Sequence, residues 1–289
     1  MRPPLRLLPL ALLAAVASGA LAGCDAASTG DEAEGTPVLR VADLHALDGT
    51  VGPPVPTLLV ATDSVYGCVN YPLSVRFERE EDALDLTVLG VEPIEICLTA
   101  LGPATARVPL DVPAGTYRLR VRHDGATDEY ELGIGADRLA LGPVRAAVTR
   151  APEPLAWRYP ERSFAYSCGT LRGEKALCDA FRQRLEASLD LTEIDAPDRG
   201  VWPYARATDG YHHNAPARYY RYRAEPDFDA AKALLREFSH DVLRGHEGDG
   251  LSVENWRGDV GPPGSTSASS GAGRGGSFRV RPPRPRRAR

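Results

Sequence analysis

Four of the five cysteines are the side chains best suited to chemistry in this 289-residue chain. Nine residues separate Cys168 from Cys178, and 28 separate Cys68 from Cys97. A redox pair usually has two intervening residues, and a zinc ribbon needs two such close pairs. Neither spacing is present, so structural disulfides are the simpler interpretation. Three pairings are open, and Cys68–Cys97 with Cys168–Cys178 is favoured because each bridge would lie within one expected domain.

Ser239, His240 and Asp241 are the residue types of a catalytic triad, but they are adjacent in the chain. Neighbouring positions on a helix point about 100° apart, so the three side chains cannot hydrogen-bond in series. The Gly-x-Ser-x-Gly turn of many hydrolases is also missing from the sequence. We therefore expect a polar helix face here and no catalytic residue.

Four of the six histidines form two loose groups, His212-His213 and His240 with His246. A metalloprotease helix needs histidines at positions i and i+4 with an adjacent glutamate, and the chain lacks this pattern. A zinc site assembled from two loops is the lesser alternative to solvated polar side chains. The sequence therefore predicts no metal ligand and no cofactor.

Arginine and tyrosine make up the whole of the run Arg218–Arg223. The simpler interpretation is that tyrosines pack beneath helices and arginines pair with surface acids. The alternative is a contact face, since both residue types are favoured at interfaces. The preceding loop, residues 206–216, is polar and long for a hairpin, and such loops often carry function. We expect this region to bind a partner, with Tyr211, His213 and Arg221 as the candidate recognition surface. Much of the aromatic content lies nearby, namely Trp202, Tyr204, Tyr211, Tyr219, Tyr220, Tyr222 and Trp256.

The first residues have the three parts of a secretory signal. Arg2 and Arg6 lie in the first six residues, residues 7–20 are apolar, and Leu21-Ala22-Gly23-Cys24 follows. The apolar stretch is shorter than the roughly 20 residues of a membrane span and suits a signal peptide, residues 1–23. The four residues at its end resemble the lipobox of bacterial lipoproteins. That resemblance implies cleavage after Gly23 and acyl chains on Cys24 that anchor the protein to a membrane.

The expected export signal and the net charge limit which partners the protein can have. The resemblance places the mature chain in the cell envelope, on a membrane that faces the periplasm or the exterior. Asp25 leaves the choice of inner or outer membrane open, because an acid after the lipid cysteine has different associations in different phyla. Nine of the 34 basic residues lie in residues 1–23 and 274–289, which hold no acid, so 25 basic residues accompany all 39 acidic ones elsewhere. Such an acidic body repels nucleic acid, which we do not expect as a partner.

Composition divides the rest of the chain. Residues 24–37 are small and acidic and predict a flexible tether, and residues 258–289 predict a disordered tail rich in Gly, Ser, Arg and Pro. Between residues 38 and 149, apolar and polar residues alternate, with turns every ten residues or so. This period of two predicts an all-β, immunoglobulin-like antiparallel sandwich. Within it, Asp124-Gly125 predicts a hairpin turn.

The second half has a different pattern. Residues 150–162 contain three prolines and predict a linker. From residue 163 to 257 we expect a small α+β domain. Its first helix, 174–189, has an apolar stripe of Leu177, Phe181 and Leu185, and Asp227 caps the second. Strands are expected over residues 163–168, 201–207, 217–224 and 251–256. The order β-α-β-β-α-β fits a ferredoxin-like fold.

These features predict a membrane-tethered, non-catalytic envelope lipoprotein that acts as a binding or assembly module. Its partners would be the membrane, through the lipid anchor, and an envelope protein or glycan. The alternative is an envelope hydrolase whose catalytic residues are scattered along the chain. Such a site would show as a pocket with two convergent carboxylates, or as a histidine–carboxylate pair of shifted pKa.

Overall fold

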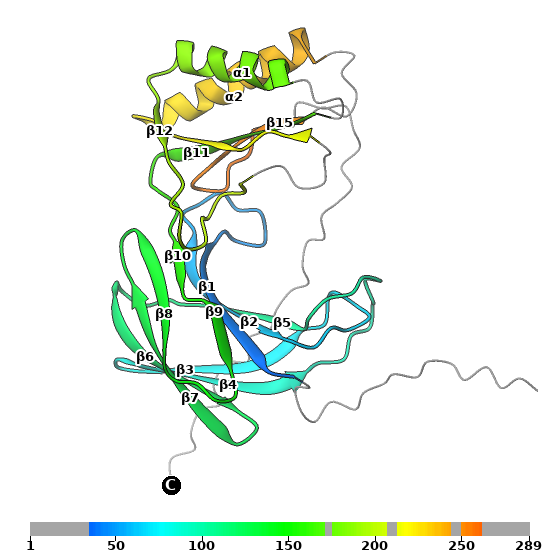
Figure 1. Cartoon of the computed structure of the whole chain (residues 1–289), viewed down its shortest axis with the longest axis vertical. Helices are drawn as coiled ribbons and strands as arrows, with labels where there is room; N and C mark the ends of the chain where they lie inside the picture. The colour runs from blue at the N-terminus through cyan, green and yellow to red at the C-terminus, as the bar shows by residue number, and fades with distance from the viewer. Residues whose placement is uncertain (1–34, 171–174, 207–212, 244–249, 262–289) are drawn as a thin grey trace, which may run out of the picture.

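β-Strands outnumber helices in the described part of the chain, which has only two helices (Figure 1). The structure is a computed structural model that describes residues 35–170, 175–206, 213–243 and 250–261. The amino-terminal part forms a sandwich of two sheets, and the carboxy-terminal part forms a third sheet covered by the helices. No helix among the described residues is long and apolar enough to cross a membrane.

One sheet of the sandwich has four strands in the order β5-β2-β1-β9. Their bounds are β1 Pro37–Leu44, β2 Val55–Thr62, β5 Thr105–Pro109 and β9 Arg150–Glu153. The other sheet has six strands in the order β10-β8-β7-β6-β4-β3. Their bounds are β3 Leu73–Glu80, β4 Ala83–Val91, β6 Gly115–His123, β7 Ala126–Ile134, β8 Arg138–Arg145 and β10 Leu155–Trp157.

The alternating residues of the two sheets meet in one hydrophobic core. Its fully buried members include Leu39, Leu58, Leu84, Leu86, Leu119 and Leu132. The predicted hairpin turn at Asp124-Gly125 joins β6 to β7, with φ of 48° and 73° at its two residues. Both angles lie in the left-handed region that such a two-residue turn requires.

Two pairings correct the expectation of a purely antiparallel sandwich. Strand β4 is parallel to β6, and β1 is parallel to β9. The first case follows from the path of the chain: after β4 it crosses to the other sheet as β5 and returns as β6 in the original direction. An alternating pattern shows that a strand is half-buried, but it does not show which strand lies beside it.

The expected linker, residues 150–162, is also different in the structure. It contains strand β9, which pairs with β1, and strand β10, which pairs with β8. The chain therefore passes from one sheet of the sandwich to the other within a few residues. Pro152 is compatible with β9 because β9 is an edge strand, where a missing backbone N–H breaks no ladder.

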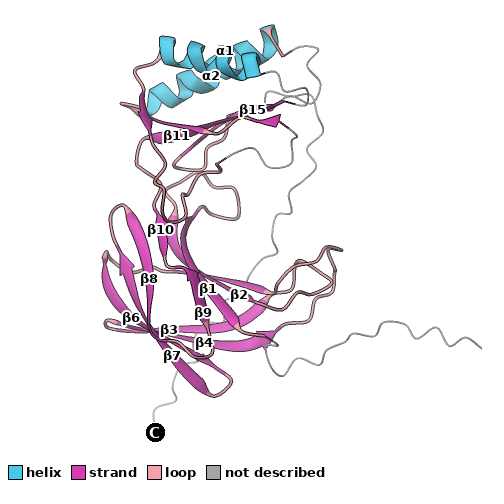
Figure 2. Cartoon of the chain, viewed as in Figure 1, coloured by secondary structure: helices cyan, strands magenta, loops and turns pink. Residues whose placement is uncertain are grey.

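The third sheet is built around β11, which is buried along its whole length. Strands β14 and β13 pair with one edge of β11, β15 pairs with the other, and β12 pairs with β14. Helices α1 and α2 cover one face of this sheet (Figure 2). The bounds are β11 Ser163–Thr170, α1 Lys175–Ser188, β12 Thr192–Ile194, β13 His213–Asn214, β14 Arg218–Arg221, α2 Glu225–Asp241 and β15 Gly250–Asn255.

The second strand of this part was predicted in the wrong place. Residues 201–207 were expected to form it, whereas the strand is β12, residues 192–194. Among the described residues 201–206, only Val201 makes a β-bridge, to Ala156 of the sandwich. Pro203 lacks the backbone N–H of a ladder residue. Its neighbours Trp202 and Tyr204 instead cover the face of the sheet opposite the helices.

Two boundaries also move. Helix α2 begins at Glu225, so Asp227 is its third residue rather than its cap. Its carboxylate accepts the backbone N–H groups of Arg223 and Ala224, at 3.1 and 2.9 Å, and so still stabilises the helix start. The expected tail was to begin at residue 258. Residues up to 261 instead run beside β15, where Val260 bridges Glu254.

Candidate functional site

Two loops of the sandwich run side by side beyond its strands (Figure 1). The first, residues 63–72, joins β2 to β3, and the second, residues 92–104, joins β4 to β5. Because β2 pairs with β5 and β3 with β4, both loops cross between the sheets at the same end of the sandwich. We call them the stapled loops, since several cross-links join one to the other.

The base of the stapled loops is held by one buried hydroxyl and a backbone pair. Thr62 Oγ1 accepts the N–H of Ala104 and donates to the carbonyl of Ser64, each at 3.1 Å. Next along the loops, Tyr66 and Gly102 exchange two backbone hydrogen bonds, of 2.8 and 3.2 Å. A Cβ on Gly102 would lie 2.7 Å from Val69 Cγ2, so only glycine permits this close approach.

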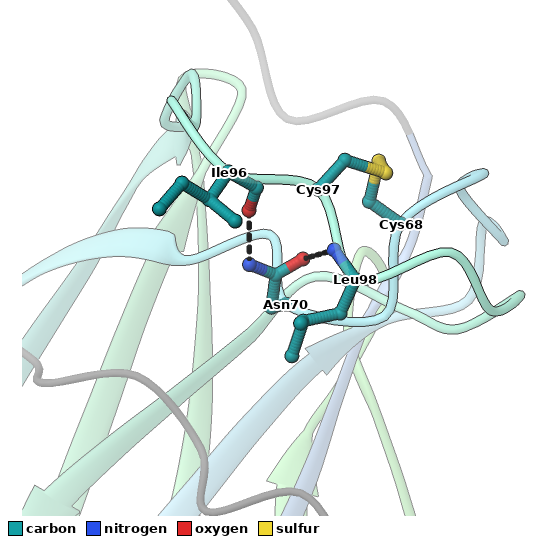
Figure 3. Close-up of a disulfide and its surroundings, with 5 residues drawn as sticks. All are labelled: Cys68, Asn70, Ile96, Cys97 and Leu98. Atoms are coloured by element: carbon teal, nitrogen blue, oxygen red, sulfur yellow. Dashed lines mark hydrogen bonds between the residues drawn. A yellow bond between two sulfur atoms is a disulfide. The ribbon is translucent and has the colours of Figure 1, made fainter.

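Nearer the end of the loops, a disulfide joins Cys68 to Cys97, as the favoured pairing predicts. The side-chain amide of Asn70 spans the same gap (Figure 3): its Nδ2 donates to the carbonyl of Ile96 at 2.7 Å, and its Oδ1 accepts the N–H of Leu98 at 2.9 Å. One side chain thus holds the backbone on both sides of Cys97. By chain entropy the disulfide contributes on the order of 3 kcal/mol.

These rigid loops expose apolar side chains. Five of them are largely in solvent: Val65 63%, Val69 43%, Ile96 74%, Leu98 44% and Leu101 78% exposed. Leu101 and Ile96 are the two most exposed large hydrophobic residues of the described part of the chain. Single exposed apolar residues are ordinary, but a cluster on a preorganised element marks an interaction surface. We call these five residues the apolar tip.

Sequence reasoning missed the apolar tip. Both loops had been interpreted only through their cysteines, as a bridge across a small sandwich. Apolar residues flank each cysteine, in Val-Tyr-Gly-Cys-Val and Ile-Glu-Ile-Cys-Leu, and the second run alternates. Alternation predicts a buried face, whereas Ile96 and Leu98 lie in a loop and are exposed.

The described structure places two of the three residues chosen from sequence as a recognition surface, His213 and Arg221, beside opposite ends of β11. Tyr211 and Cys24, the residue expected to carry the lipid anchor, lie outside the described residues. The backbone of His213 pairs with Thr170 in β13 and β11. Arg221 is exposed at the end of β14. The binding role of these three residues stays a prediction.

The aromatic residues that motivated that choice form cores instead. Tyr220 and Tyr222 pack beneath the helices, while Trp202, Tyr204 and Tyr219 pack on the opposite face of the sheet. All five are 7% exposed or less. These five aromatic residues therefore form no exposed contact surface, and their number does not indicate a recognition site.

Two of the three arginines of the same run pair with surface acids, as the simpler interpretation holds. Arg218 Nη1 lies 2.7 Å from Glu193 Oε1, and Arg223 Nη1 lies 3.5 Å from Asp190 Oδ2.

The second disulfide, Cys168–Cys178, joins β11 to α1 within the core beneath the helices. It too has the favoured pairing, and both cysteines are buried, as is typical of a structural disulfide.

Ser239, His240 and Asp241 form no triad. The Ser239 hydroxyl donates to the carbonyl of Leu235, one turn earlier in α2, at 2.7 Å. The His240 ring bonds its exposed neighbour Asp241 at 2.9 Å. Within the described ranges, no group of three or more His, Cys, Asp and Glu side chains is placed to hold a metal ion.

Ionisable groups do gather where the third sheet meets the sandwich. Asp43 at the end of β1 is buried and accepts two hydrogen bonds from Arg158 Nε, at 3.2 and 3.0 Å. Burial raises the pKa of Asp43 even though Arg158 lowers it. Burial likewise raises the pKa of Glu254 on β15. His45, which follows β1, bonds the carbonyl of Trp256 at 3.0 Å and lowers both pKa values electrostatically.

A recess of about 690 Å³ lies on the outer side of the six-stranded sheet. Its lining includes Arg118 and the acids Glu80, Glu81, Asp82, Glu129 and Glu131. Five carboxylates against one guanidinium repel an anionic ligand.

Comparison with known proteins identifies no relative of this chain: no family model, curated protein or solved structure matches it.

Proposed function

We propose that the chain is a lipid-anchored, non-catalytic protein of the bacterial cell envelope that acts as a binding or assembly module. The observation that carries this proposal is the apolar tip, five exposed hydrophobic side chains held on loops that are cross-linked to each other. Rigid presentation lowers the entropy lost on binding, which is how a contact surface of modest size becomes useful. Two disulfides support export to an oxidising compartment.

The proposal divides the mature chain into a tether, residues 24–37, a sandwich, an α+β domain and a tail. We take the sandwich to be immunoglobulin-like and the α+β domain to be ferredoxin-like. The strand order β12-β14-β11-β15, antiparallel throughout and with both helices on one face, supports the second assignment. Partners would be the membrane, through Cys24, and an envelope protein or glycan. The acidic body argues against nucleic acid.

Replacement of Cys24 by alanine tests the anchor. The variant should leave the membrane fraction or stay unprocessed, and it should lose incorporation of a labelled fatty acid, while the wild type keeps both. A Cys68→Ser/Cys97→Ser variant is the matched control, because it removes two cysteines without touching the lipid site. Unchanged membrane association and labelling after Cys24→Ala would overturn the lipoprotein assignment.

One observation favours the alternative, an envelope hydrolase. Two carboxyl groups of raised pKa, Asp43 and Glu254, lie near His45. A hydrolase that used them would lose activity on Glu254→Gln or His45→Ala while remaining folded. The bonds of both Asp43 oxygens to Arg158 favour a structural role for that residue, and we therefore prefer the binding module.

A further inference from the structure

We propose that the apolar tip rests in the surface of the bilayer that holds the lipid anchor, so that the sandwich stands on the membrane and carries the α+β part away from it. This inference rests on the proposed lipid anchor at Cys24. It goes further by naming which surface of the folded chain touches the bilayer and by assigning the lipid surface as its occupant.

The segment that leads from the anchor enters the folded part beside the first stapled loop. Thr36 and Asp63 are joined by two hydrogen bonds: the N–H of Thr36 donates to Asp63 Oδ1 at 2.7 Å, and the N–H of Asp63 donates to the Thr36 carbonyl at 3.1 Å. Asp63 begins the first stapled loop, and Val65 of the apolar tip follows two residues later. The chain therefore enters its fold beside the apolar tip.

The segment that connects the anchor to the folded part is short. Ten residues lie between Cys24 and Gly35, the first described residue. Fully extended, this stretch spans roughly 40 Å at most, and it is shorter whenever it is not fully extended. A short tether keeps the nearest part of the fold at an effective concentration of about millimolar at the bilayer surface. A weak apolar contact is then enough to fix an orientation.

The stapled loops carry apolar and acidic side chains and no basic ones. Neither loop, residues 63–72 or 92–104, contains lysine or arginine, while Glu92 and Glu95 are exposed there. Attraction to anionic headgroups therefore does not drive the contact. Five aliphatic side chains that enter the interface by about 5–10 Å do so through burial of apolar surface alone. Anionic lipid should consequently not strengthen binding, because the exposed acids of these loops repel it.

The direction of β1 fixes what lies at the far end. The strand starts beside Asp63 and ends at Leu44, where His45 contacts Trp256 of the α+β part. Eight residues of strand span about 26 Å. A tip seated in the bilayer thus holds Arg221 and the rest of the α+β part outward, where a soluble or neighbouring envelope partner can reach them.

The test uses the full lipidated protein in phosphatidylcholine vesicles whose acyl chains carry bromine, which quenches nearby tryptophan. The native Trp157, Trp202 and Trp256 lie at the α+β end, so the wild type sets a low background. Leu101→Trp should add emission that brominated lipid quenches about twofold, because the interfacial depth brings that side chain to the acyl chains. Leu47→Trp is the matched control: Leu47 is 49% exposed on the loop after the far end of β1.

Flotation of the same vesicles tests the lipid anchor separately from the contact of the apolar tip with the bilayer. Wild type that does not float with the vesicles has no anchor, and this result overturns both the proposed function and the inference. Protein that floats while Leu101→Trp is quenched no more than Leu47→Trp overturns the inference alone and gives the apolar tip to a protein partner. An increase of quenching on addition of phosphatidylglycerol would contradict docking by apolar contact. Near-ultraviolet circular dichroism of each variant shows that it is folded.

Discussion

Arg158 lies against the buried carboxylate of Asp43, with 3.0 Å between Nε and Oδ2 and 24% and 1% of the two side chains exposed. Arg158 also donates to the carbonyl of Gly135, at 3.1 Å. One guanidinium thus ties the segment before β11 to β1 and to the turn before β8. This pair fixes the α+β part to the end of the sandwich opposite the stapled loops.

We expect Arg158→Met to destabilise the protein by about 3 kcal/mol, because it leaves the Asp43 carboxylate buried without its cation. Urea denaturation followed by circular dichroism measures this loss. Arg223→Met is the control: its ion pair with Asp190 leaves 80% and 76% of the two side chains exposed, and such pairs contribute less than about 1 kcal/mol. Equal effects of the two substitutions would show that Arg158 does not hold the joint.

Glu254→Gln should stabilise the protein at neutral pH. Burial raises the pKa of Glu254 above its ordinary value of 4.5, so the folded state binds the proton more tightly than the unfolded state does. Above the raised pKa the ionised carboxylate destabilises the fold, and the amide removes that effect. The gain in Tm should shrink as the pH falls through the raised pKa, and it should vanish below about 4.5. A gain that persists there, or grows, would contradict the assigned cause.

Asn70→Ala should loosen the stapled loops without unfolding the sandwich. The Leu98 amide loses its acceptor, and its hydrogen exchange should accelerate by about 5- to 10-fold, as expected for loss of about 1 kcal/mol. Asn70→Asp is the comparison variant: it keeps the acceptor for Leu98, but it replaces the donor to Ile96 by a carboxylate oxygen that the Ile96 carbonyl repels. If the Leu98 amide exchanges at one rate in the wild type and both variants, Asn70 does not order this loop.

Regular strands and helices could be predicted from the sequence where a long period is visible. Leu84, Leu86 and Val88 alternate over the nine residues of β4, and Leu177, Phe181 and Leu185 recur at one face of α1. The period is a direct record of which face is buried. The expected helix, 174–189, therefore agrees with α1 within one residue at each end, while for β4 the period predicted a strand and not its ends.

Short or proline-containing strands could not be found in the same way. Strand β12 has three residues and no buried one, so it carries no period, and Pro152 and Pro154 gave residues 150–162 the composition of a linker. The parallel pair β4–β6 depends on a crossing between sheets, which no local pattern records. The apolar tip was missed because exposure of Ile96 and Leu101 is decided by the loop path and not by residue type.

The amino-terminal residue of the mature protein is the most direct test of the central claim. Mass spectrometry of the protein isolated from the source cells should find an amino-terminal peptide that begins at Cys24 and carries the mass of a diacylglyceryl group, with or without a further acyl chain. The remaining four cysteines should appear as Cys68–Cys97 and Cys168–Cys178. A mature chain that begins at any other residue, or a Cys24 without lipid, would contradict the account.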